Sequence, residues 1–157
     1  YNLWHQENQF CPLCSLVPES KYHLILNCPI TRFLWDLLAP HLLKLHYKSI
    51  TKEEMAFGIE GNTANVILRN WLTFLLRECI IDQERIAYKN KLGLNNITDI
   101  QCTFTARLKK EILQSYEYHK NQGTIQIFRH IYRTDGGFLE YDEDIQHYTF
   151  PNIFNTT

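Results

Sequence analysis

Three cysteines and one histidine lie close together near the start of this 157-residue chain. Their order and spacing is Cys11-x2-Cys14-x8-His23-x4-Cys28. Thiolate and imidazole groups are the ligands that Zn²⁺ takes in structural sites, four of them in a tetrahedron. Because this set would fill all four positions and leave none for a substrate, we predict one structural, non-catalytic Zn²⁺ ion at these residues.

Two other interpretations of the four residues are open. The cysteines could be core residues that happen to lie near a surface histidine, or Cys11 and Cys14 could form an isolated redox pair. The redox interpretation leaves His23 and Cys28 without a role, so we favour the metal. His5 could replace a ligand if one of the four is misassigned.

The other cysteines give no further site. Cys79 and Cys102 each lie alone in a helical pattern, which is typical of small buried apolar residues. The odd total of five cysteines argues against a closed set of disulfides.

The segment that follows the metal residues has the apolar spacing of a helix. Pro29 suits a first helical position, and apolar residues recur at helical intervals to about Tyr47. Pro40 lies inside this pattern, so we expect a kink or a break into two helices there.

Capping signals predict the next helices. Thr51 with Glu54 forms a capping box for a short helix that ends at Gly58. The strongest helical pattern covers residues 64–90, and its second half, from Asp82 on, is polar and expected to project into solvent. The main apolar stripe of that helix comprises Leu68, Trp71, Leu72, Leu75 and Cys79.

A second capping box, Thr98 with Gln101, predicts another helix that ends near Lys120. Its apolar stripe is Ile100, Phe104, Leu108, Ile112 and Tyr116. Residues 124–133 fit a short helix or a strand equally well. The predicted fold is therefore mostly α, with a small zinc module at 1–36, a helical domain at 37–134 and an acidic C-terminal tail at 135–157 that either docks or stays mobile.

Charge is unevenly distributed along the chain. The net charge is −1, but the tail holds five acids and no Lys or Arg, which leaves 16 bases against 12 acids in the remainder. A mild excess of this kind permits contact with nucleic acid without requiring it. No apolar run approaches the roughly 20 residues of a membrane span, and residues 1–10 lack the apolar stretch of a secretory signal. We expect no membrane association and an intracellular location, in the nucleus or the cytoplasm.

The residues around the predicted zinc site resemble the zinc-binding segment at the C-terminal end of non-LTR (LINE-type) retrotransposon reverse transcriptases. That segment reads Cys-Pro-x-Cys, a Glu four residues before His, an apolar triplet, Cys-Pro, and a helix with Trp. The matching residues here are Cys11-Pro12-Leu13-Cys14, Glu19 with His23, Leu24-Ile25-Leu26, Cys28-Pro29 and Trp35. The resemblance covers residues 10–36, and beyond them only the general plan is similar.

This resemblance implies nucleic-acid binding. In that family the segment helps to hold template RNA or target DNA during target-primed reverse transcription. The candidate contacts here are two groups of three residues, Lys21, Tyr22 and Arg32 beside the zinc ligands and Arg107, Lys109 and Lys110 on a later helix. The plainer interpretation of the first group is solvated charge and a packed ring.

The chain lacks catalytic motifs of that family. It has no Tyr-x-Asp-Asp polymerase motif and no endonuclease motif, and Tyr141-Asp142-Glu143-Asp144 lacks the two adjacent aspartates. We therefore expect a non-catalytic part of a larger reverse transcriptase, with the rest of that polypeptide as a partner, or a host protein derived from one. A domesticated or isolated zinc-stabilised adaptor for protein interactions is the alternative. An enzyme in its own right is disfavoured, because no nucleophile–base pair is visible.

Overall fold

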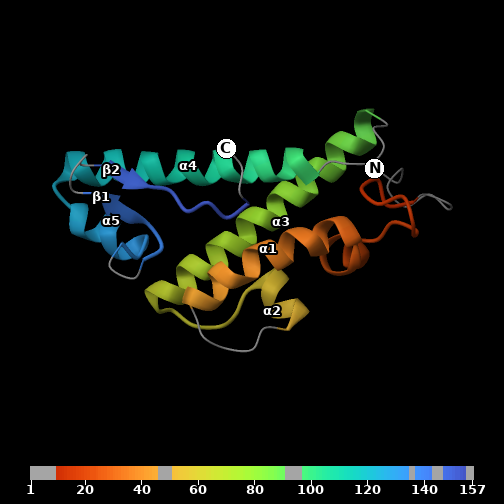
Figure 1. The fold of residues 1–157 in the computed structure, drawn as a ribbon, viewed down its shortest axis with the longest axis horizontal. Coiled ribbons are helices and arrows are strands. Elements are labelled where there is room, and N and C mark those ends of the chain that lie inside the picture. Colours follow the sequence, from red (N-terminus) through yellow and green to blue (C-terminus); the bar gives the residue numbers. More distant parts are fainter. Residues whose placement is uncertain (1–9, 46–50, 91–96, 135–136, 143–146, 155–157) are drawn as a thin grey trace.

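The computed structural model describes residues 10–45, 51–90, 97–134, 137–142 and 147–154, and these residues are mostly helical (Figure 1). The predicted fold class is confirmed, because a Cys/His cluster precedes a helical region. In chain order the elements are η2 (His23–Asn27), α1 (Pro29–Leu45), α2 (Lys52–Phe57), α3 (Ala64–Asn90), α4 (Ile97–Gln122), α5 (Ile125–Ile131), β1 (Glu140–Asp142) and β2 (His147–Thr149).

Helix α1 follows the cysteine cluster directly and runs unbroken through Pro40 (Figure 1). The expected break is therefore absent. Pro40 is exposed, so the carbonyl group that loses its helical hydrogen bond can be solvated instead. The opposite side of α1 is buried through Leu34, Leu38 and Leu42. The predicted end at Tyr47 lies outside the described residues.

The short helix α2 has the predicted capping box. The Thr51 hydroxyl accepts a hydrogen bond from the Glu54 amide at 3.1 Å, and the Glu54 carboxylate accepts one from the Thr51 amide at 3.1 Å. Gly58 ends the helix with a φ of +94°, a conformation that favours glycine. The Asn70 side chain then bonds both the amide and the carbonyl of Ile59, at 2.9 and 2.7 Å, which fixes the loop to α3.

Helices α3 and α4 are the two long elements, and α3 crosses α4 obliquely and packs against it (Figure 1). The predicted bounds of α3, 64–90, are confirmed. Helix α4 begins at Ile97, so Thr98 lies inside the helix and is not its cap. The facing stripes are buried through Leu68, Leu72, Leu75 and Cys79 of α3 and Ile100, Phe104, Leu108 and Ile112 of α4.

The second half of α3 is exposed on one face only, through Arg85, Ile86 and Lys89, so the expectation that it projects into solvent is wrong for the other face. Gln83, Glu84 and Ala87 are buried, because the segment that carries the metal residues packs on this end of the helix. We expected this half to be exposed because its residues are polar. The sequence alone does not show that a buried carboxylate such as Glu84 has a cationic partner.

The acidic tail contributes to the core. Residues 124–133, which fitted a helix or a strand, form α5, and β1 and β2 then pair as an antiparallel hairpin with Tyr141 opposite Tyr148. Phe154 packs on Phe104 of α4 at a ring-centroid distance of 4.9 Å, and Tyr148 packs on Tyr116 at 5.3 Å. The described part of the tail therefore docks against α4.

Two further facts bear on the organisation of the chain. The predicted boundary between residues 36 and 37 falls inside α1, and residues from all three predicted segments share one buried cluster. Among the described residues, no helix combines the length and the apolar character that crossing a membrane would require.

Candidate metal centre

The four predicted metal residues come together in the structure. Their ligand atoms, three sulfurs and one ring nitrogen, all lie within 4.8 Å of one another. The Cys11 and Cys28 sulfurs are 3.9 Å apart, and the Cys14 sulfur lies 3.3 Å from Nε2 of His23. The three cysteines are buried and His23 is half-buried. This cluster can hold one metal ion.

A short hairpin positions the first two cysteines. The Cys11 amide donates to the Val17 carbonyl at 2.8 Å, and Phe10 bridges to Pro18 across the hairpin. Between them the Ser15 amide donates to the Cys11 carbonyl at 2.8 Å, with Ser15 at a positive φ of 59°. This tight turn leaves both sulfurs on one side, and the Leu16 amide approaches the Cys14 sulfur at 3.5 Å.

A π-helical turn positions the second two ligands. In η2 the Cys28 amide donates to the carbonyl of His23, five residues earlier, at 2.6 Å. A π turn stacks residue i+5 over residue i, whereas an α-helix stacks residue i+4. The wider turn thus brings His23 and Cys28, which are five positions apart, to the same side.

Residues of the apolar triplet and of α1 hold this turn in place. Leu24, Ile25 and Leu26 are buried. The indole of Trp35 donates to the Ile25 carbonyl at 2.9 Å, and the Thr31 hydroxyl donates to the Leu24 carbonyl at 2.7 Å. Trp35 and the triplet, which belong to the motif of the resemblance, therefore have a structural role beside the ligands.

The protonation of the ligands suits a metal. Burial lowers the pKa of His23, so the imidazole is neutral at pH 7 with a lone pair available. The hydrogen bond between the two thiols lowers the pKa of Cys28, and the same bond together with burial raises the pKa of Cys11. Cys28 is therefore the first of the two to become a thiolate, and a bound cation would be needed to hold both as thiolates.

A pair of carboxyl groups joins this module to α3. Glu84 of α3 is fully buried, and its Oε1 lies 2.5 Å from the Lys21 ammonium. Burial, followed by the neighbouring Glu84, raises the pKa of Glu19 to about 8. Glu19, the acidic residue of the motif, is therefore protonated at neutral pH, which removes the repulsion between the two carboxylates.

The candidate nucleic-acid residues are only partly brought together. Tyr22 and Arg32 are exposed beside the cluster, whereas Lys21 is engaged with Glu84. Arg107 forms an ion pair with Asp82 of α3 at 2.5 Å, and Lys109 lies over the ring of Phe150 in the tail, 5.9 Å from its centroid. Arg107 and Lys109 thus face different neighbours.

Sequence reasoning missed two residues around the centre. Glu84 lies in the polar half of α3, where nothing in the pattern distinguishes it from its exposed neighbours. Thr31 bonds the π turn from the first turn of α1, and the position of a hydroxyl residue three after the last cysteine is a weak signal. His5 lies outside the described residues.

Comparison with known proteins adds no relative. No family model, curated protein or solved structure matches this chain. The function must therefore be inferred from the centre itself.

Proposed function

We propose that the cluster binds one Zn²⁺ ion as a structural site. A tetrahedron with Zn–S bonds of about 2.3 Å has edges of about 3.8 Å between sulfurs, and the Cys11 and Cys28 sulfurs are 3.9 Å apart. Three thiolates and one neutral imidazole are a common ligand set for structural zinc. The ion would hold the hairpin and the π turn together and supply no chemistry to a substrate.

The zinc module serves to present a nucleic-acid-binding surface in the C-terminal part of a LINE-type reverse transcriptase, where it holds template RNA or target DNA. The observation that carries this proposal is that the motif of residues 10–36 brings its three cysteines and its histidine into one cluster and leaves Tyr22 and Arg32 exposed beside it. Tyr22 is 61% exposed, so its ring is available to stack on an unpaired base, while Arg32 is available to a phosphate.

The structure changes how the basic residues should be tested. Replacement of Lys21 would leave the buried Glu84 without its cation, which destabilises a fold in itself. Lys21 is therefore a poor test of nucleic-acid contact, although it was one of the first candidates. Arg32→Ala and Tyr22→Ala remove exposed side chains and are the informative variants.

The test measures the affinity of the zinc-loaded protein for fluorescent RNA and DNA at several salt concentrations. Each phosphate contact contributes about 0.7–0.9 to the slope of log affinity against log salt, so Arg32→Ala should lower the slope by about that amount. The control is Lys120→Ala, an exposed lysine in the last turn of α4. Equal losses in both variants, or no salt-sensitive binding by the intact protein, would refute the proposal.

A protein-interaction adaptor is the second candidate. The hairpin that carries Cys11 and Cys14 exposes apolar side chains, with Leu16 70% and Phe10 55% exposed, and surface of this kind favours a protein partner. If nucleic acid does not bind while a separately produced reverse-transcriptase polypeptide does, and Leu16→Ser abolishes that complex, the adaptor interpretation holds.

A further inference from the structure

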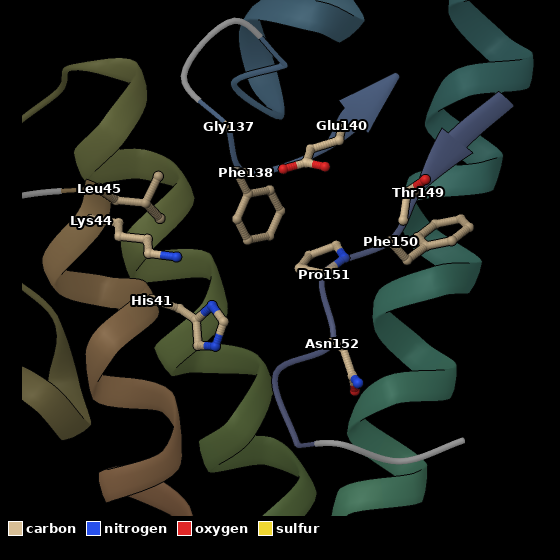
Figure 2. A pocket seen from close by; sticks show the side chains of 10 residues that line it. All are labelled: His41, Lys44, Leu45, Gly137, Phe138, Glu140, Thr149, Phe150, Pro151 and Asn152. Carbon is tan, nitrogen blue, oxygen red and sulfur yellow. The ribbon is translucent and has the colours of Figure 1, made fainter. Parts of the chain in front are cut away.

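A cavity of about 310 Å³ lies between α1 and the C-terminal tail, away from the metal residues. Figure 2 shows its two walls: His41 and Lys44 extend from α1, and the segment from Thr149 to Asn152 passes opposite them. Phe138 and Glu140 complete the lining from the strand side. Its volume is near the lower end of the range for ligand pockets, about 300–1,000 Å³, which suits one small ligand or one unit of a polymer.

The lining combines aromatic surface with one charge of each sign. The Phe138 ring and Pro151 supply apolar surface, whereas the Phe150 ring points toward α4, where Lys109 lies over it (Figure 2). Lys44 is the cation and Glu140 the anion among the lining residues, and both are exposed. Neither forms an ion pair with another group in the described parts of the chain.

His41 adds a neutral polar group to the same wall. Its side chain is half-buried. Burial and the nearby Lys44 lower the pKa of His41, so at pH 7 the ring offers a hydrogen-bond donor and an acceptor without charge. A ligand that suits this cavity has a flat ring, one anionic group that meets Lys44, and hydrogen-bond donors that meet the acceptor-only carboxylate of Glu140.

We propose that this cavity binds the unpaired 3′-terminal ribonucleotide of an RNA strand, with its base against the Phe138 ring, its 5′-phosphate at Lys44 and its free 2′- and 3′-hydroxyls at Glu140. The inference rests on the proposed function, because it assumes that the protein meets nucleic acid. It adds a second contact site and a specificity for the strand end that the zinc module does not provide.

The charges of the lining favour a strand end over an interior nucleotide. An interior nucleotide carries a second phosphate on its 3′ oxygen, and that phosphate would lie against the Glu140 carboxylate, where the two negative charges repel. A terminal nucleotide instead presents two hydroxyl donors there, which a carboxylate accepts. Hydroxyl recognition also separates RNA from DNA at this position.

The test compares one short RNA, labelled at its 5′ end, with three different 3′ ends: free hydroxyls, a 3′-phosphate and a terminal 2′-deoxynucleotide. We expect the free-hydroxyl end to bind about tenfold more tightly than the 3′-phosphate, with the deoxy end in between. Glu140→Gln should reduce the preference to less than about twofold without changing the melting temperature, because Glu140 is exposed. Glu60→Gln, another exposed acid, is the matched control and should keep the preference.

The outcomes separate this inference from the proposed function. If all three RNAs bind equally with the usual salt dependence, the end-binding site is refuted and the proposed function stands. If none of the three RNAs binds, the end-binding site is refuted, while the proposed function is decided by the DNA arm of its own test.

Discussion

At the scale of single residues, the metal centre depends on two short segments that fold in different ways, a hairpin and a π turn. Structural zinc contributes binding free energy directly to folding, so an ion held by all four residues should supply part of the free energy that orders the two segments. Replacement of any of the four ligands should therefore lower the stability of both segments.

We expect Cys14→Ser and His23→Ala each to lower the zinc content below one ion per chain and to lower the melting temperature. Structural zinc contributes binding free energy directly to folding, so a chelator should have the same effect on the unaltered protein. The measurements are elemental analysis and thermal denaturation. Cys102→Ser is the control, because Cys102 lies outside the cluster and is exposed, contrary to the buried position expected from the sequence. A metal-free protein with unchanged melting would contradict the site.

The Glu19–Glu84 pair gives a dependence on pH. The folded protein raises the pKa of Glu19 from 4.5 to about 8, so it keeps a proton that the unfolded chain releases above its ordinary pKa. Between about pH 4.5 and 8 unfolding thus releases a proton, and this pair's contribution to stability falls as pH rises.

Denaturant unfolding at saturating zinc, measured across pH 5.5–8, should show this fall. In Glu84→Gln the second charge is absent, so the decline with pH should be shallower than in the unaltered protein. The slope of unfolding free energy against pH must be compared between the two proteins, because zinc binding itself strengthens as its ligands lose protons and this affects both equally. Identical slopes for the two proteins would show that the carboxyl groups are not coupled.

At the scale of elements, the interface between α3 and α4 carries the central packing. Leu72 is fully buried in it, whereas Ile67, five residues earlier on α3, is 57% exposed. We expect Leu72→Ala to lower the free energy of unfolding by about 2–5 kcal/mol through the cavity that it leaves, and Ile67→Ala to change it by less than about 0.5 kcal/mol. Denaturant titration measures both, and similar losses would mean that α3 is rotated from its described orientation.

Periodicity and capping residues predicted most of these elements. The capping box of Thr51 and Glu54 and the bounds 64–90 are local signals, and both are confirmed. The four ligands were also predicted, because their spacing is local. The π turn was not, since its wide hydrogen bond depends on Trp35 and Thr31 from α1. The burial of Glu84 depends on Lys21, which is 63 positions away, and no local pattern contains such a partner.

At the scale of the whole molecule, the tail closes the core from the C-terminal side. Phe154 is buried against Phe104, whereas Tyr118 on α4 is 59% exposed. We expect Phe154→Ala to cost about 3–5 kcal/mol in unfolding free energy and Tyr118→Ala to cost less than about 0.5 kcal/mol. If Phe154→Ala costs no more than the control, the tail does not stabilise the helical core.

The ion pair between Lys21 and Glu84 has a consequence for the opening motions of the native protein. It links the metal module to the second half of α3 across 63 positions. A local opening of the module therefore removes Lys21, the cation that pairs with the buried Glu84. Amide hydrogen exchange should then report the two segments as one cooperative unit. Partial removal of the ion should speed exchange at the amides of Gln83 to Ala87 together with those of the π turn, while the amides around Leu72 stay protected.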